Sequence, residues 1–288
     1  MKIVRFIGGL GNQMFQYAFY KALKQRFSAV KADISAYDKY SASYSNGFEL
    51  QTIFGLSLDF TSKDENDRYS KPEKRSLVRS IARNFKKNQP EYFTEVPGVI
   101  DLSVLYKDSP GYYNGFWQSE KYFTAVRETI KSDFSQWPEL DEKNEQVRNL
   151  IHSTESVAVH VRRGDYIDTV FDKICTTDYY LKAVEQLENV IKRTPTYFIF
   201  SNDINWCREN INFPNQVFIS SNNAKNSYKD MQLMSLCKHN IIANSSFSWW
   251  SAWLNANEEK KVLCPGKWCH VPNIDFSDLL PSSWLKIY

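Results

Sequence analysis

Short apolar runs rich in β-branched and aromatic residues alternate with segments of helical period through the second half of the chain. This alternation limits the fold more than any other feature. The first run is Ser156–Val161, and a segment whose apolar residues recur with helical spacing follows each run except the last. Strands that alternate with helices build βαβ units, whose strands lie parallel in one sheet. The pattern predicts a Rossmann-like α/β domain with strands at 156–161, 197–200, 217–220, 239–243 and 261–263 and helices at 177–192, 204–210, 226–236 and 247–255.

The first half opens in a similar way, with an apolar strand at residues 2–7, a glycine-rich turn, and a helix that begins at Asn12. Residues 35–110 are polar and have weak periodicity, and a polar, acidic stretch at 138–145 separates the two halves. We therefore predict two Rossmann-like domains that face each other, residues 1–145 and 146–288. The other elements expected in the first domain are strands at 30–32 and 112–117 and a helix at 119–133.

The charge balance argues against a nucleic-acid-binding protein. The net charge is +3, from 36 basic and 33 acidic residues, and the one local basic cluster lies at 71–87. A protein that binds nucleic acid usually carries a strongly basic face. The cluster at 71–87 has two interpretations, a basic helix that rests on an acidic membrane surface or a solvated helix face.

Cysteine usage and the start of the chain indicate a reducing, cytoplasmic setting. The five cysteines include no Cys-x-x-Cys, and together with four scattered histidines they offer no zinc-ligand spacing. The first residues are too few to form a signal peptide, and no apolar run approaches the roughly 18 residues of a membrane-spanning helix. We therefore expect a cytoplasmic protein.

Parallel α/β sheets bind ligands at the carboxyl ends of their strands, so the residues that follow each strand are the candidates for a site. Two arginines at a strand end can bind phosphate oxygens in a bidentate manner, and a neighbouring aspartate can hold one guanidinium in place. A surface pair of arginines that is bound by the aspartate is the alternative. The strand at 156–161 leads into such a cluster, which consists of His160, Arg162, Arg163, Gly164 and Asp165.

Two further polar clusters follow strands of the same sheet. Asn202 and Asp203 come after the strand at 197–200 and can bind a base or ribose, or can simply cap the next helix. After the strand at 239–243, small hydroxyl residues stand at a helix N-terminus, where backbone N–H groups and the helix dipole favour an anion. Three clusters at one sheet edge predict an anion-binding nucleotide site. The third cluster contains Asn244, Ser245, Ser246 and Phe247, whereas Trp249, Trp250 and Trp253 have a spacing typical of core residues.

The glycine-rich turn of the first half differs from the common nucleotide-binding loops. Met14 stands where G-x-G-x-x-G has its third glycine, and no Lys-Ser/Thr follows as in a P-loop. Asp33 does lie about 20 residues further on, as a nicotinamide-dinucleotide site requires. No Asp-x-Asp occurs in the chain, and arginines with a helix N-terminus can neutralise a leaving diphosphate without a metal ion.

Taken together, these motifs resemble those of the alpha-1,2-fucosyltransferases, glycosyltransferase family 11. The resemblance spans residues 1 to about 265 and implies a GT-B fold, in which two Rossmann-like domains face each other across a cleft. It implies transfer of L-fucose from GDP-β-L-fucose to the 2-hydroxyl of a terminal β-galactose, with inversion and with neither a metal nor another cofactor. The segments that carry it are GGLGNQMFQYA at 8–18, HVRRGDY at 160–166 and SSFSWW at 245–250, with NGFEL at 46–50 and GFWQSE at 115–120.

The resemblance also implies roles for individual residues. Arg162 is expected on the β-phosphate, with His160 in the same pocket and Arg163 beside it. The remaining donor contacts are expected from Gly11, Asn12, Asn202, Asp203, Asn244, Ser245, Ser246 and Phe247. The chain resembles bacterial members that act on galactose-terminated glycans made in the cytoplasm. That leaves room for peripheral contact with the inner membrane through glycolipid acceptors.

The general base stays open at this point. Asp165, Glu49, Asp33 and His160 are candidates, and a water relay is another possibility. Asp165 is expected to brace one of the arginines, and Glu49 lies in the acceptor-side half. We take Arg162, Asp165 and Glu49 as the catalytic set. Three alternatives also stay open: another GDP-sugar transferase with a different acceptor hydroxyl, a nicotinamide-dependent oxidoreductase, and a non-catalytic glycan-binding module with an aromatic cleft.

Overall fold

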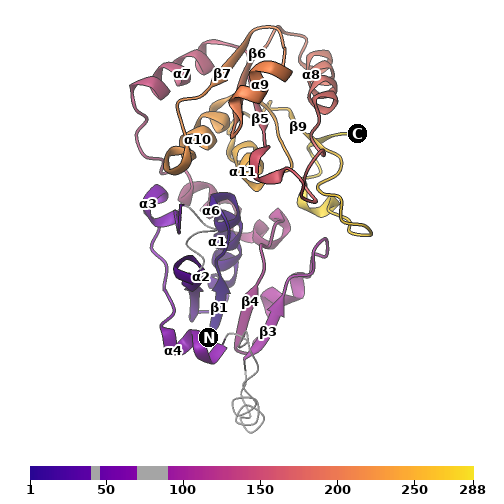
Figure 1. Ribbon diagram of the computed structural model, residues 1–288. Coiled ribbons are helices and arrows are strands. Elements are labelled where there is room, and N and C mark those ends of the chain that lie inside the picture. The colour runs from indigo at the N-terminus through magenta and orange to yellow at the C-terminus, as the bar shows by residue number, and fades with distance from the viewer. Residues whose placement is uncertain (40–45, 70–89) are drawn as a thin grey trace. The chain divides into compact units, whose positions relative to one another are not determined.

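The computed structural model describes residues 1–39, 46–69 and 90–288 (Figure 1). The chain divides into two compact units, Met1–Ser135 and Gln136–Tyr288, and each unit has its own parallel sheet. The predicted α/β architecture of two Rossmann-like domains, as in the GT-B type, is therefore confirmed. The division falls before the predicted boundary at residue 145, which stays a prediction. The basic cluster at 71–87 lies outside the described residues.

The first unit holds a four-stranded sheet in the order β2-β1-β4-β3. The two central strands are parallel neighbours, and Val4 of β1 pairs with Ala32 on one side and Tyr113 on the other. The strands are β1 Lys2–Arg5, β2 Val30–Asp33, β3 Glu91–Thr94 and β4 Gly111–Asn114. The helices are α1 Leu10–Lys24, α2 Ser35–Lys39, α3 Leu50–Phe54, α4 Lys63–Tyr69 and α6 Arg127–Asp133, with 3-10 turns η1 Leu102–Tyr106 and η2 Glu120–Val126.

The predicted elements of this unit differ from the structure by one or two residues at their ends, except for two that differ more. The strand expected at 112–117 ends at Asn114, and Trp117 has a left-handed backbone with φ of 57°, which does not belong to a strand. The helix expected at 119–133 is a 3-10 segment followed by α6, with a break at Phe123. The ring of Phe123 is fully buried and lies 6.4 Å from the ring of Phe15, so core packing accounts for the break.

The second unit holds a six-stranded sheet in the order β10-β9-β8-β5-β6-β7, with all its pairs parallel. The five predicted strands are present, and β10 is an additional edge strand. The strands are β5 Ser156–Val161, β6 Thr196–Ser201, β7 Gln216–Ile219, β8 His239–Ile241, β9 Val262–Pro265 and β10 Leu285–Ile287. The helices are α7 Glu142–Ser153, α8 Thr177–Ile191, α9 Ile204–Asn210, α10 Tyr228–Leu236 and α11 Ser246–Leu254.

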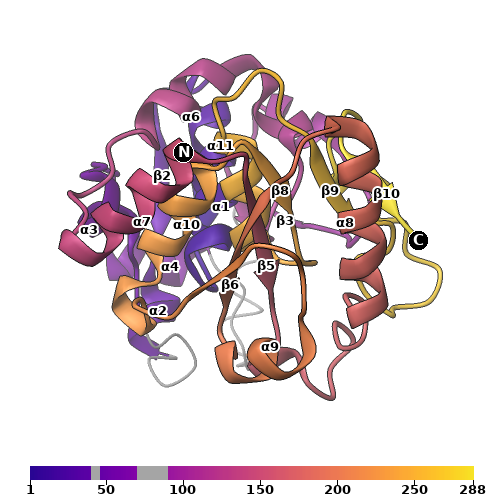
Figure 2. The ribbon, with the colours of Figure 1, turned by 90° about the horizontal axis from the view of Figure 1, so that it is seen from above.

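Helices cover both faces of this second sheet. Figure 2 shows α8 on one side of the strands and α7 and α10 on the other. Val157 and Val159 of β5 belong to the apolar cluster with α8, whereas Ala158 belongs to the cluster with α7 and α10. Burial on both faces explains why these strands are continuous apolar runs in the sequence. The tryptophans of α11, predicted as core, are buried, which confirms that prediction: Trp249, Trp250 and Trp253.

The strand order creates one switch point in each sheet. In the second unit the chain runs from β5 outward through β6 and β7, then returns to β8 on the other side of β5. In the first unit β1 likewise lies between β2 and β4. Loops that leave two neighbouring strands in opposite directions open a crevice at their carboxyl ends, and ligands bind there in open α/β sheets. The carboxyl ends of β5 and β8 are therefore the first place to look for a site.

A cluster of charges around Glu155 lies at the amino ends of the strands of the second sheet. Its carboxylate accepts hydrogen bonds from Arg193 Nη1 at 3.1 Å, Lys238 Nζ at 2.9 Å and His239 Nε2 at 3.1 Å. Burial alone would raise the pKa of Glu155, but the hydrogen bonds from Lys238, Arg193 and His239 lower it to about 2. The cluster ties the start of β5 to the start of β8.

We expect Glu155→Gln to lower the free energy of unfolding at pH 7 by about 1–3 kcal/mol, because charged hydrogen bonds are lost. A carboxyl whose folded pKa is depressed stabilises the fold above its unfolded pKa, and that contribution disappears as the pH falls toward about 2. The gap between variant and wild type in urea unfolding should therefore narrow from pH 7 to pH ~3. Glu145→Gln, which removes an ion pair within α7, is the control and should change stability by less than about 0.5 kcal/mol. An equal gap at both pH values would contradict this assignment.

Candidate functional site

Arg162 follows β5 and lies at the switch point of the second sheet. Its Nη2 donates to Asp165 Oδ2 at 2.8 Å, and its guanidinium lies 5.5 Å from the ring centre of Tyr166. The Tyr166 hydroxyl donates to the carbonyl of Asn244 at 3.2 Å, which links the loop after β5 to the loop after β8. The side chain of Arg162 is 30% exposed, so a cationic group stands at the carboxyl end of β5 with its orientation fixed by two neighbours.

Arg163 is held on α9 instead. Its guanidinium stacks 4.0 Å from the ring centre of Trp206, and its Nε lies 3.5 Å from Asp203 Oδ2. Its backbone N–H donates to Asn202 Oδ1 at 2.9 Å. The two adjacent arginines therefore have different partners, and Arg163 serves the β6–α9 side of the site.

Gly164 permits the turn between these arginines and Asp165. Its φ is +49°, a left-handed conformation that favours glycine, and a Cβ on Gly164 would lie 2.7 Å from Asn202 Nδ2. The same Asn202 nitrogen lies 3.3 Å from Asp165 Oδ1, to which it donates. Asp203 accepts the backbone N–H of Trp206 at 3.2 Å as the cap of α9. In the structure both Asn202 and Asp203 thus hold this turn and the start of α9.

His160, near the end of β5, is almost completely buried at 4% exposure. Burial, followed by the charge of Arg162, lowers its pKa to about 3, so the imidazole is neutral at physiological pH. Its ring centre lies 5.7 Å from that of Phe247, and within the described part of the chain its Nδ1 has no hydrogen-bond partner. A neutral imidazole with an unused nitrogen can donate or accept one hydrogen bond at the strand end.

The third predicted cluster forms the N-terminus of α11. Ser245 caps this helix and accepts the backbone N–H of Phe247 at 3.3 Å, while Ser246 and Phe247 are half-buried. Asn244 is 2% exposed and its Nδ2 donates to the carbonyls of Phe171 and Trp268, at 3.1 and 3.0 Å. The side chain of Asn244 therefore holds two surrounding loops.

The three clusters thus come together around one switch point. A guanidinium from the loop after β5 and a helix N-terminus from the loop after β8 are both attractive to an anion. A neutral imidazole lies between these loops in the buried layer below. Such an arrangement can bind a phosphate group and can stabilise negative charge that grows on it.

The glycine turn of the first unit occupies the corresponding switch point of the first sheet. Gly8 has φ of +83°, and a Cβ on it would lie 2.6 Å from Asn12 Nδ2. Asn12 Oδ1 accepts a hydrogen bond from Gln118 Nε2 at 2.7 Å, in the loop after β4. Gly11 is buried in the first turn of α1. Asn12, predicted to reach the donor, therefore connects the β1 and β4 loops.

Two buried glutamines of α1, which the sequence did not single out, hold the surrounding loops. Gln13 Nε2 donates to the carbonyls of Gly8 and Gly47, at 3.2 and 2.9 Å, and Gln13 Oε1 accepts the backbone N–H of Glu49 at 2.8 Å. Gln16 Oε1 accepts the backbone N–H of Ile7 at 3.0 Å. Gln16 Nε2 donates to the carbonyl of Gly115 at 3.0 Å.

Two of the candidate bases, Asp33 and Glu49, have different surroundings in the structure. Asp33 is 2% exposed and accepts three hydrogen bonds, from the Tyr112 hydroxyl at 2.5 Å, Asn66 Nδ2 at 2.9 Å and the backbone N–H of Ser35 at 2.9 Å. These three hydrogen bonds give Asp33 a structural role, which argues against Asp33 as the general base. Glu49 is 7% exposed, and burial raises its pKa to about 7 against a hydrogen bond from Asn46 that lowers it.

Two further carboxyl groups escaped the sequence analysis, because each stands alone in an unremarkable stretch. Burial raises the pKa of Glu95, although backbone N–H groups of the loop after β4 lower it; the N–H of Phe116 donates to Glu95 Oε2 at 2.6 Å. Asp230 of α10 accepts from Asn222 Nδ2 at 2.7 Å, and burial raises its pKa to about 7. Glu95 holds the loop that carries Gln118, and Asp230 ties α10 to the loop after β7.

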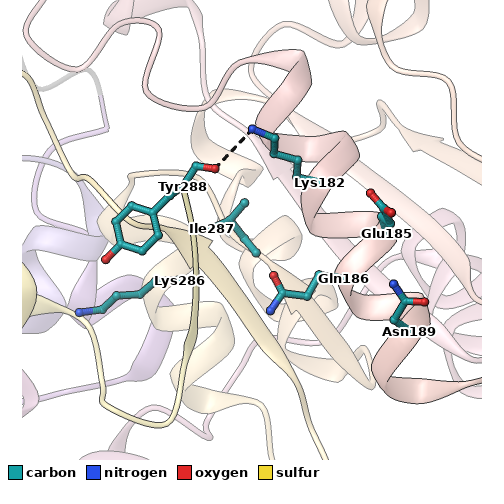
Figure 3. A pocket seen from close by; sticks show the side chains of 7 residues that line it. All are labelled: Lys182, Glu185, Gln186, Asn189, Lys286, Ile287 and Tyr288. Atoms are coloured by element: carbon teal, nitrogen blue, oxygen red, sulfur yellow. Dashed lines mark hydrogen bonds between the residues drawn. The ribbon is translucent and has the colours of Figure 1, made fainter.

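A cavity of about 310 Å³ lies elsewhere, between α8 and the β10 edge of the second sheet (Figure 3). It contains none of the predicted site residues; polar side chains of α8 and the segment Lys286, Ile287 and Tyr288 line it. No group of three or more metal-ligating side chains occurs in the described ranges. None of the helices in those ranges is long and apolar enough to cross a membrane.

Comparison with known proteins agrees with the motifs. The family model described as "Glycosyl transferase family 11" matches residues 66–272. An "Alpha-1,2-colitosyltransferase" from Escherichia coli is 33% identical over 308 residues, which cover 99% of this chain and 98% of that protein. The "O-antigen biosynthesis glycosyltransferase WbnK" of the same species is 32% identical over 97% of this chain and 98% of its own.

More distant proteins are similar as well. A "Galactoside alpha-(1,2)-fucosyltransferase 1" from Ateles belzebuth is 30% identical over 153 residues, which cover 49% of this chain and 42% of that protein. The crystal structure of NodZ alpha-1,6-fucosyltransferase, co-crystallised with GDP, has a TM-score of 0.50 and covers 87% of this chain and 90% of its own. Its sequence identity is 14%, so it supports the fold alone. The full-length match to the bacterial transferases and the family model over most of the chain lead to one conclusion: this chain belongs to glycosyl transferase family 11.

Proposed function

We propose that this glycosyltransferase moves L-fucose from GDP-β-L-fucose to the 2-hydroxyl of a terminal β-galactose, with inversion at C1 and without a metal ion. The observation that carries the proposal is the meeting of Arg162 and the α11 N-terminus at the β5–β8 switch point. A diphosphate is the part of the donor that such a pair of groups recognises. Membership of family 11 supports the transfer reaction itself.

Arg162 is the residue that we propose for the β-phosphate. Asp165 fixes its guanidinium through the 2.8 Å ion pair, and Arg163 supports the turn from α9. We propose that Ser245, Ser246 and Phe247 contact the diphosphate and base, that His160 offers a neutral hydrogen-bonding group, and that Asn202, Asp203 and Asn244 keep the surrounding loops in place. Gly11 and Asn12 contribute to the donor side through the first-unit loop.

The proposed reaction is a single displacement. The galactose 2-oxygen forms a bond to C1 of fucose while the bond from C1 to the β-phosphate oxygen breaks, and GDP leaves with the bonding electron pair. Arg162 stabilises the negative charge that grows on GDP. The proton of the acceptor hydroxyl passes to Glu49, whose pKa of about 7 suits a general base at neutral pH.

We expect Arg162→Ala to lower kcat by about 10²- to 10³-fold, because a charge contact made in the transition state is lost. Arg148→Ala removes another arginine of the second unit, 42% exposed on α7, and should leave the rate unchanged. GDP release with GDP-fucose and a galactoside measures the rate, and thermal unfolding confirms that both variants fold. A folded Arg162→Ala enzyme with near-normal kcat would contradict the central assignment.

We expect Glu49→Gln to lower kcat by about 10²- to 10⁴-fold, since a neutral amide cannot accept the hydroxyl proton. For the wild type, kcat/KM should rise with pH through about 7, as Glu49 loses its proton, and the variant should lack this rise. Glu91→Gln, an exposed change on β3, serves as the control. A pH profile of Glu49→Gln that overlays the wild type would remove Glu49 from the mechanism.

A second donor has a specific observation in its favour, because a relative matched over almost the whole chain is an alpha-1,2-colitosyltransferase. Colitose is L-fucose without its 3-hydroxyl group. A site built to bind that hydroxyl rejects the deoxy sugar by as much as about 10⁴- to 10⁵-fold, whereas an apolar pocket discriminates far less. The donor that gives the larger kcat/KM therefore also reports the polarity of the pocket around C3.

A panel of donors and acceptors tests the proposed function directly. GDP-fucose and GDP-colitose are each offered with lactose and other galactosides, GDP release is followed, and the product linkage is determined. We expect an α1,2 linkage to galactose and an unchanged rate in excess EDTA. A different linkage would redirect the proposal to another acceptor hydroxyl, and loss of rate in EDTA would refute metal independence.

The remaining alternatives predict different responses to ligands. A nicotinamide-dependent oxidoreductase would show fluorescence quenching by NADH, whereas the proposed enzyme responds to GDP alone. A non-catalytic glycan-binding module would bind galactosides with no release of GDP over time. The presence of GDP release and product therefore separates all of these classes.

A further inference from the structure

The side-chain amide of Gln13 is bonded to three backbone groups from two separate segments of the first unit. Its Nε2 donates to the carbonyl of Gly8, at 3.2 Å, and to that of Gly47, at 2.9 Å. Its Oε1 accepts the backbone N–H of Glu49 at 2.8 Å. Gln13 is fully buried, so each of these bonds is made away from water, where an unsatisfied partner is costly.

Apolar neighbours hold the residues on both sides of Glu49. The ring of Phe48 lies 5.6 Å from Phe6, 5.9 Å from Tyr37 and 5.9 Å from Phe60. Leu50 is fully buried and begins α3. These contacts fix where residues 48 and 50 lie, and the bond from Gln13 fixes the peptide N–H of the residue between them.

We propose that Gln13 is a positioning residue for Glu49: its amide sets the backbone at Glu49, and thereby the direction in which the Glu49 carboxyl meets the acceptor hydroxyl. The inference rests on the proposed function, in which Glu49 is the general base. Gln13 itself is fully buried and its amide is bonded to backbone groups, so its effect on the reaction is indirect. It acts on Glu49 through its bonds to the Gly47 carbonyl and to the backbone N–H of Glu49.

The chemistry of the three bonds requires an amide. Two carbonyls must receive N–H donors, while one backbone N–H must find an acceptor, and only a side-chain amide of this length supplies both ends. A carboxylate keeps the acceptor but repels the two carbonyls. A thioether fills the volume and makes none of the three bonds. Gly47, with φ of +70°, allows the sharp turn that brings its carbonyl to Gln13.

The surroundings of the Glu49 carboxyl make its titration a usable signal. Within the described residues, burial and the hydrogen bond from Asn46 are the causes that act on it, and no charged side chain is among them. On the neighbouring α2, Tyr37 packs against Phe48 and its hydroxyl donates to the carbonyl of Gly8 at 2.9 Å, while the carboxyl-bearing Asp38 of the same helix is exposed. If the Glu49 carboxyl moves relative to Asn46, or becomes more or less buried, the midpoint of the pH profile should therefore move.

Gln16 offers a matched control on the same helix. It is also a fully buried amide that bonds to backbone groups, but its partners are Ile7 and Gly115 rather than the segment of Glu49. Gln13→Met and Gln16→Met remove comparable bonds from comparable environments. Differences between the two variants therefore report the link to Glu49 and not the general cost of losing a buried amide.

The experiment is a double-mutant cycle on the full chain, with GDP-fucose and a galactoside as substrates. We expect Gln13→Met to lower kcat by about tenfold to a hundredfold, with little change in the KM for GDP-fucose, and to shift the midpoint of the pH profile. In the Glu49→Gln background the same substitution should change kcat less than twofold, because the base it positions is already absent. Gln16→Met should have the same effect in both backgrounds and leave the pH midpoint in place.

Hydrogen exchange gives a reading that does not depend on turnover. The Glu49 amide should exchange at least about tenfold faster in Gln13→Met than in the wild type or in Gln16→Met, since its acceptor is lost. Gln13→Glu, which keeps the acceptor and the volume, serves if Gln13→Met does not fold. It should retain slow exchange at Glu49, while kcat falls because the bond to the Gly47 carbonyl in the same segment is lost.

Each result has a defined meaning. Equal losses from Gln13→Met in both backgrounds, or an unchanged pH midpoint, overturn the positioning role even if Glu49→Gln is inactive. Full turnover in Glu49→Gln overturns the proposed base, and with it any positioning role in catalysis, whereas faster exchange at Glu49 would then still record the contact itself. Non-additive losses with faster exchange support the inference.

Discussion

Every strand pair of the two sheets is parallel, and this constraint determines where chemistry can occur. The loops that follow parallel strands all lie at one end of the sheet. Polar residues from segments far apart in the sequence therefore meet there because of the strand direction, and not because their own side chains attract each other. The return of the chain from β7 to β8 then opens that edge beside β5. The arginine cluster and the α11 N-terminus are neighbours for this reason.

The site in the second unit separates two residues that are adjacent in sequence. Arg162 forms an ion pair with Asp165 and lies over the ring of Tyr166, whereas Arg163 stacks on Trp206. The left-handed turn at Gly164 makes the separation possible, and Asn202 packs closely against the turn. Adjacent like charges would otherwise repel each other, and different acidic partners, Asp165 and Asp203, compensate them individually.

Much of the fold follows from the sequence because the central strands are buried on both faces and form continuous apolar runs. The edge strands β3 and β10 were missed, since an edge strand is short and only half-buried, so that its residues resemble those of a loop. The ends of the predicted strands indicate which residues lie at the candidate site, but they do not indicate which side chains those residues contact. Trp206 lies in a predicted helix and Gln118 in the motif at 115–120, but no sequence pattern pairs them with Arg163 or Asn12. Glu95 comes from a segment with no local signal, and only tertiary packing brings it to the loop after β4.

The glutamines of α1 bond to main-chain atoms alone, and this has a consequence for how the loops around them can vary. Gln13 binds the carbonyls of Gly8 and Gly47 and the N–H of Glu49, which are all main-chain atoms, and a positive φ favours glycine at positions 8 and 47. Exposed side chains in these loops can therefore be exchanged while the main-chain path stays in register. A scaffold of this kind keeps the path of its loops when exposed side chains change, so the loop surface can vary while the main chain stays as it is.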